Sequence, residues 1–136
     1  MKKNNKKWLL ASKNISKINP SESDKNLIKE YFQPLIDSFK KKYILTNPNK
    51  DSNYLIDIYS KWYQGYFYLI EKYKSEHPNR IADEFEIKFV RLKFVGNNLF
   101  DFSYLRHSNQ WFLIAENKTK EECLEMIKSN SAFHPI

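Results

Sequence analysis

Hydrophobic residues recur every three or four positions over residues 21–43, which is the spacing of one face of an α-helix. The apolar positions are Leu27, Ile28, Tyr31, Phe32, Leu35, Ile36, Phe39 and Tyr43. Ser21 precedes them as an N-cap, and Glu22 and Asp24 follow in the first turn, where the helix dipole favours acids. Because Pro34 lies inside this stripe, the pattern predicts either one kinked helix or two helices that meet there.

Residues 54–74 fit two patterns. Their apolar residues suit one long amphipathic helix, whereas Gln64-Gly65 between two aromatic-rich runs suits a β-hairpin. Gly65 favours the hairpin, because glycine inside a helix costs about 1 kcal/mol relative to alanine and a tight turn uses its freedom. The hairpin predicts these cross-strand partners: Tyr63 with Tyr66, Trp62 with Phe67, Tyr59 with Ile70, Asp57 with Lys72, and Ile56 with Tyr73.

Further strands are predicted after the Pro78-Asn79 turn. Apolar and polar residues alternate over residues 85–94, the pattern of a strand with one buried face. The alternation slips by one residue between Phe89 and Val90, which predicts a β-bulge. After the turn at residues 96–98, alternation resumes over residues 100–104, and a last apolar run covers residues 111–114.

Thr119 and Glu122 have the spacing of a capping box at the start of a helix that we expect to end near Ser129. Of the 22 aromatic residues, 16 lie between Tyr54 and Phe112, and aromatic residues favour strands. The sequence therefore predicts an α+β fold. Its parts are an N-terminal helix, kinked or split at Pro34, an antiparallel sheet of about five strands, and a C-terminal helix.

The net charge of +7 is unevenly distributed over the 136 residues. Residues 1–20 contain six lysines and no acidic residue, which leaves +1 for residues 21–136. We therefore expect a basic tail over residues 1–20 and a single domain over residues 21–136. Four of these lysines, Lys2, Lys3, Lys6 and Lys7, are candidates for contact with an anionic partner.

The single cysteine, Cys123, excludes an internal disulfide, and no apolar run approaches the roughly 18–20 residues that span a bilayer. We expect a cytoplasmic protein with no membrane contact. The two glycines exclude glycine-rich phosphate loops. No pair of histidines or cysteines has metal-ligand spacing, so we expect neither a metal nor a cofactor. Cys123 lies in the apolar stripe of the last helix, where an inert buried thiol is expected.

Glu86 and Lys88 form an E-x-K motif on one face of a predicted strand. Some metal-dependent nucleases use this spacing, with the carboxylate on a metal and the lysine at the attacked phosphate. Asp57 is the candidate for the second acidic residue such a site needs. The simpler interpretation is the polar face of a strand.

A second candidate site combines two aromatic residues, an arginine and a titratable histidine near one strand end. Its members are Tyr104, Arg106, His107 and Trp111. At one edge of a sheet they would suit an anion or a small ligand. The alternative is a turn in which the arginine stacks on the tryptophan.

Residues 54–135 contain several short motifs that are characteristic when taken together. They are Lys61-Trp62, Gly65-Tyr66-Phe67-Tyr68, the run from Phe85 to Leu92, Tyr104-Leu105-Arg106-His107, Glu122-Cys123-Leu124 and Phe133-His134-Pro135. In these motifs the chain resembles a family of small bacterial proteins of unknown function. The resemblance implies a bacterial cytoplasmic protein and no particular activity.

The absence of an assembled catalytic set favours a non-enzymatic binding or adaptor protein that uses an aromatic-rich sheet. We expect its partner to be another protein or a small anionic ligand. One alternative is nucleic-acid binding assisted by the lysine-rich tail. The other is a metal-dependent nuclease around Glu86 and Lys88.

Overall fold

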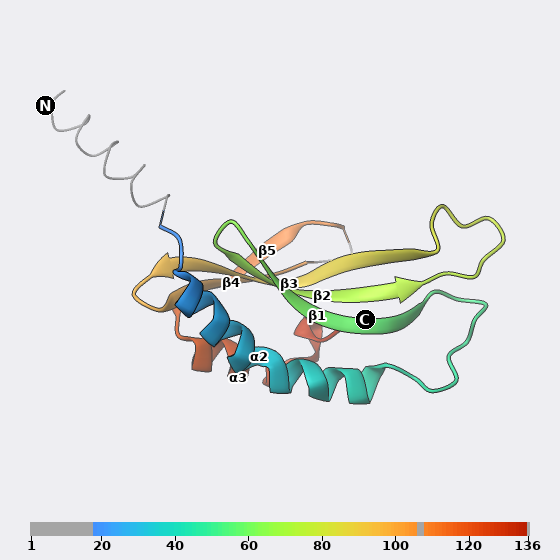
Figure 1. The fold of residues 1–136 in the computed structure, drawn as a ribbon, viewed down its shortest axis with the longest axis horizontal. Coiled ribbons are helices and arrows are strands. Elements are labelled where there is room, and N and C mark those ends of the chain that lie inside the picture. Colours follow the sequence, from blue (N-terminus) through green and yellow to red (C-terminus); the bar gives the residue numbers. More distant parts are fainter. Residues whose placement is uncertain (1–17, 106–107, 136) are drawn as a thin grey trace, which may run out of the picture.

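The computed structural model describes residues 18–105 and 108–135. The elements are α2 (Glu22–Tyr43), β1 (Tyr54–Tyr63), β2 (Tyr66–Lys74), β3 (Glu84–Gly96), β4 (Leu99–Leu105), β5 (Trp111–Lys118), α3 (Lys120–Ser129) and the short 3-10 helix η1 (Ser131–Phe133). The strands form one antiparallel sheet in the order β1-β2-β3-β4-β5, and α2 and α3 lie on the same side of it (Figure 1). The predicted α+β fold is confirmed.

Helix α2 begins where its capping residues predict. The Ser21 hydroxyl accepts a hydrogen bond from the Asp24 backbone N–H at 3.1 Å, and the Asp24 carboxylate accepts one from the Ser21 N–H at 3.4 Å. Pro34 lies inside this single helix, so the split form does not occur. Buried residues on both sides of Pro34 pack on the sheet, and this packing holds the two halves of the helix together.

Strands β1 and β2 form the predicted hairpin. Gln64 and Gly65 make its turn with positive φ angles of 49° and 84°, the geometry that suits the twist of a two-residue hairpin. The confirmed partners are Tyr63 with Tyr66, Trp62 with Phe67, Tyr59 with Ile70, and Asp57 with Lys72. The predicted partnership of Ile56 with Tyr73 is wrong: the register shifts between Leu55 and Asp57, and Leu55 becomes the partner of Tyr73.

The bulge predicted in the third run is also confirmed. Val90 pairs with Leu69 and Lys88 pairs with Ile70, which leaves Phe89 as the extra residue of β3. The Phe89 side chain is buried, with its ring centroid 6.5 Å from that of Phe39 in α2. The bulge therefore turns an additional aromatic ring into the core without disturbing the pairing on either side.

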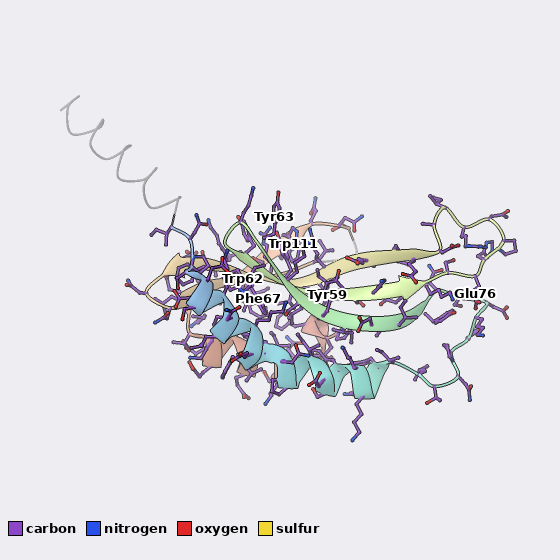
Figure 2. The ribbon with its side chains drawn as sticks, viewed as in Figure 1. Tyr59, Trp62, Tyr63, Phe67, Glu76 and Trp111 are labelled. Atoms are coloured by element: carbon purple, nitrogen blue, oxygen red, sulfur yellow. The ribbon has the colours of Figure 1, made fainter. Side chains whose placement is uncertain are left out.

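One face of the sheet packs against the helices and forms the core. The Phe67 ring lies 5.5 Å from Phe32 of α2, and the Trp62 indole N–H donates a hydrogen bond to the Lys25 carbonyl at 3.0 Å. Figure 2 shows Trp62 and Phe67 at the level where α2 meets the sheet. Because side chains alternate along a strand, their neighbours Tyr63, Tyr66 and Tyr68 point to the other face.

The C-terminal segment completes this core. Thr119 and Glu122 form the predicted capping box, and Cys123 is fully buried, as expected. Burial raises the pKa of the Cys123 thiol to about 12, so the thiol stays protonated. His134 connects the segment to both helices through hydrogen bonds of 2.7 Å to the Tyr43 hydroxyl and to the Ile127 carbonyl. In the part of the chain that the structure describes, no helix is long and apolar enough to cross a membrane.

Candidate functional site

The face of the sheet opposite the core is not covered by either helix, and we call it the open face. In Figure 1 both helices lie below the sheet, and Figure 2 shows Tyr63 and Trp111 on the opposite side. The strand registers place these side chains on the open face: Tyr59, Lys61, Tyr63, Tyr66, Tyr68, Lys88, Arg91, Lys93, Ser103, Trp111 and Leu113.

The centre of the open face is the side chain of Arg91. Its guanidinium carbon lies 4.6 Å from the centroid of the Trp111 indole and 5.0 Å from the centroid of the Tyr66 ring. The guanidinium therefore contacts an aromatic ring from β2 and another from β5. Contacts between a cation and the face of an aromatic ring stabilise by about 0.5–1 kcal/mol at exposed sites.

Tyr68 and Lys88 extend this group. The Tyr68 ring lies 6.0 Å from both the Tyr66 and the Trp111 rings, and the Lys88 ammonium lies 4.7 Å from the Tyr68 centroid. We call Tyr66, Tyr68, Lys88, Arg91 and Trp111 the aromatic–cation cluster. Burial raises the pKa of the Tyr68 hydroxyl, although the positive charge of Arg91 opposes the shift.

The surroundings of the cluster are partly apolar. Tyr63, next to the β1–β2 turn, is 55% exposed, and so is Leu113 on β5. Single exposed apolar side chains are common on protein surfaces, but here they flank three aromatic rings on one face. Within the cluster Tyr66 and Trp111 are half-buried and Tyr68 is buried, since the rings pack on one another and on the cations.

Positive charge is concentrated at the same end of the open face. Lys61 and Lys93 are exposed beside the cluster, and with Lys88 and Arg91 they provide four cations. The register partner of Lys93 is the acidic residue Asp101, and its carboxylate accepts a hydrogen bond from the Asn117 N–H at 3.0 Å. This end of the sheet is thus basic, although residues 21–136 together carry only +1.

At the other end of the open face, charges neutralise one another. Lys72 forms an ion pair with Glu84 at 3.1 Å. The Tyr59 hydroxyl donates a hydrogen bond to the Glu86 carboxylate at 2.5 Å. Burial, followed by this contact with Glu86, raises the pKa of Tyr59 to about 12. The positive character of the face is therefore local to the cluster.

The structure separates the predicted residues of the strand-end site. Trp111 is the partner of Leu105 and lies on the open face, whereas Tyr104 faces the core, with its ring 5.0 Å from Phe133. Neighbouring residues of β4 point to opposite faces, so Tyr104 and Trp111 do not line one pocket. Arg106 and His107 lie outside the described residues, as do Lys2, Lys3, Lys6 and Lys7.

Tyr104 instead lines a hollow of about 510 Å³ on the core side of the sheet, together with Glu71, Tyr73 and His134. The Tyr73 hydroxyl donates a hydrogen bond to the buried Glu71 carboxylate at 2.5 Å. Burial, and then this carboxylate, raise the pKa of Tyr73. A role for Tyr104 in ligand binding stays a prediction, and it belongs to a different surface from Trp111.

The residues of the nuclease alternative are engaged elsewhere. Glu86 accepts a hydrogen bond from Tyr59, Lys88 lies over Tyr68, and Asp57 forms an ion pair with Lys40 at 3.2 Å. Among residues 18–105 and 108–135, no three histidine, cysteine or acidic side chains are grouped so that they would hold a metal ion.

Sequence reasoning missed the centre of the cluster. In the alternation over residues 85–94, Arg91 is only a polar position between Val90 and Leu92, and in the hairpin pattern Tyr66 and Tyr68 are only strand formers. The alternation could have predicted this group of side chains. Every second residue of β2 near the turn is a tyrosine, and these tyrosines lie on the face without core contacts.

These features define a small α+β protein whose antiparallel sheet is covered by helices on one face and carries aromatic and cationic side chains on the other. A family model described as a domain of unknown function, DUF3024, matches residues 20–135. The chain belongs to this family, in agreement with the resemblance seen in its motifs. Neither the curated proteins nor the solved structures include a match to this chain.

Proposed function

We propose that this protein is a binding protein and that its ligand is planar and anionic. The observation that carries the proposal is the position of Arg91 between the rings of Trp111 and Tyr66 on the open face. Such a site offers ring faces for stacking and a positive charge for a ligand anion at the same place.

The charge distribution supports an anionic ligand. Lys61, Lys88, Arg91 and Lys93 gather at this end of the open face, and Asp101, the register partner of Lys93, offsets one of these four positive charges. A negative ligand is attracted there, whereas a positive one is repelled. The nuclease alternative has less support, since Glu86 and Lys88 are both engaged with tyrosines.

The dye 1-anilinonaphthalene-8-sulfonate tests this proposal. It combines a flat naphthalene ring system with a sulfonate anion, and its fluorescence increases when its rings leave water. We expect the full-length protein to bind it, and we expect Trp111→Ala and Arg91→Gln to weaken the binding at least fivefold, which is about 1 kcal/mol. Two variants on other surfaces serve as controls: Ile81→Ala, at a fully exposed loop residue, and Lys41→Gln, on the exposed side of α2.

Equal dye affinity in the four variants and the wild type would place dye binding elsewhere and contradict the proposal. Thermal unfolding of each variant separates loss of the site from loss of the fold. The adaptor role expected from the sequence stays a prediction. If the folded protein does not bind the dye, a protein partner becomes the better-supported ligand.

A further inference from the structure

We infer that the ligand of the open face is single-stranded nucleic acid. This inference rests on the proposed function, since it names the ligand class of the same site. Two half-buried rings, Tyr66 of β2 and Trp111 of β5, each lie 6.0 Å from the buried Tyr68 ring on a sheet face without a helix cover. An aromatic platform with cations beside it is the usual means of holding unpaired bases, because every base has a face that stacks.

The arrangement selects against double-stranded nucleic acid. In a duplex the base faces are stacked on one another, so they are hidden from Tyr66 and Trp111. Only the phosphates of a duplex would reach the lysines of the open face. The presence of rings among the cations therefore gives the single strand an additional source of affinity of about 1–3 kcal/mol for each stacked base.

Arg91 has a specific part in this inference. Its guanidinium now covers ring faces of Trp111 and Tyr66. A base that stacks on either ring takes the place of the guanidinium, which then becomes available to a phosphate of the same strand. Guanidinium groups form bidentate hydrogen bonds with phosphate, so the displaced contact with a ring is replaced by a contact with the ligand.

The first described residues, Ile18 and Asn19, lie at the same end of the sheet. The Asn19 side chain lies beside Gly65 in the β1–β2 turn, and the Ile18 side chain lies beside Gly96 in the β3–β4 turn. The Gly65 turn also carries Tyr63 and Tyr66. Residues 1–17, which precede Ile18 in the sequence, contain six lysines, and their charge is a second source of attraction for phosphates.

Fluorescence anisotropy with the full-length protein tests the inference. The probes are labelled single-stranded DNA and RNA of about 15 nucleotides and a duplex of the same length, each at about 50 and 200 mM salt. We expect both single strands to bind at least tenfold more tightly than the duplex. If four phosphates are contacted, the affinity for single strands should fall roughly 50-fold over this salt range.

Variants locate the binding. Trp111→Ala and Tyr66→Ala should each weaken single-strand binding at least fivefold, whereas Trp111→Phe, which keeps a ring face, should retain most of it. Ile81→Ala and Lys41→Gln should leave it unchanged. A variant with Lys2, Lys3, Lys6 and Lys7 all changed to Gln should bind more weakly, with a smaller salt slope and the same preference for single strands.

Equal affinity for duplex and single strand would overturn the inference. Binding that depends on the four lysines but not on Trp111 or Tyr66 would also overturn it, because the strand would then contact only the N-terminal segment. If neither nucleic acid binds but the dye still needs Trp111 and Arg91, the inference fails and the proposed function stands. If the dye and the oligonucleotides both fail to bind, both are wrong.

Discussion

Arg91 and Trp111 are in contact across the open face although β4 lies between their strands: the Arg91 guanidinium carbon is 4.6 Å from the Trp111 ring centroid. The register makes this contact possible, because the β4 residue beside Arg91 is Ser103. Ser103 has a short side chain, so the long arginine can extend over it toward β5. The contact thus depends on the identities of three residues on three neighbouring strands.

The first prediction concerns the strength of this contact. In a double-mutant cycle with Arg91→Ala and Trp111→Ala, we expect a coupling free energy of about 0.5–1 kcal/mol in favour of the pair. Urea unfolding of the wild type, the two single variants and the double variant measures it. A coupling of zero within error would show that the two side chains do not interact in solution.

The second prediction compares neighbouring residues on opposite faces. Trp62→Phe removes the hydrogen bond to the Lys25 carbonyl and part of the packing on Phe67, so it should lower the free energy of unfolding by about 1–2 kcal/mol. Tyr63→Phe, at a side chain that is 55% exposed, should change it by less than about 0.5 kcal/mol. Urea denaturation curves give both values, and the reverse order would contradict the assignment of the two faces.

The third prediction concerns the two glycines. Both have positive φ angles, 84° at Gly65 and 90° at Gly96, so alanine at either position is strained by about 1–2 kcal/mol. At Gly65 an added Cβ would also lie 3.2 Å from the Asn19 side-chain oxygen, whereas at Gly96 its nearest contact is an ordinary 3.6 Å. Gly65→Ala should therefore be the more destabilising substitution in thermal unfolding. Gly65→Asn is the control, because asparagine tolerates positive φ and should cost less than alanine.

The fourth prediction is a dependence of stability on alkaline pH. The pKa of Tyr59 is raised from 10.0 to about 12 in the folded protein, so between these values the unfolded chain loses the proton first. The contribution of Tyr59 to stability is therefore complete below pH 10 and is lost as the pH rises toward 12.

Tyr59→Phe cannot ionise at this position, so it tests the pH effect directly. We expect the difference in unfolding free energy between the wild type and Tyr59→Phe to shift in favour of the variant from about pH 9 to pH 12. Urea unfolding at several pH values measures the shift. A difference that is independent of pH would show that Tyr59 titrates alike in the folded and unfolded chains.

Local patterns were sufficient to predict most of the elements. Ser21 and Thr119 act as N-caps because each hydroxyl bonds an N–H group within its own first helical turn, and such a contact follows from residues three positions apart. Gly65 similarly marked the hairpin turn, and the slip after Phe89 marked a bulge. The predicted partner of Tyr73 was wrong because no local pattern marks the bulge at Ile56. The alternation of residues in β1 shows no obvious interruption there.

The candidate site was predicted much less well, for a geometric reason. The sequence groups Trp111 with Tyr104 because the two residues are close along the chain, yet their side chains lie on opposite faces of the sheet. Trp111 instead contacts Arg91, which is distant along the chain and is not among the predicted site residues. A sequence pattern shows which residues of one strand share a face, but it does not show which strand lies beside it.

By itself, the sequence determined the class of fold, the single cysteine, the uneven distribution of charge and the positions of most turns and caps, because these depend on composition and on neighbours a few residues apart. Only the tertiary structure decided which face of the sheet the helices cover, and therefore which aromatic residues are core and which remain at the surface. Tyr66 and Phe67 are adjacent and chemically similar in a sequence, but packing of α2 buries Phe67 and leaves Tyr66 beside Arg91. Burial depends on contacts between distant segments, and those contacts exist only once the chain has folded.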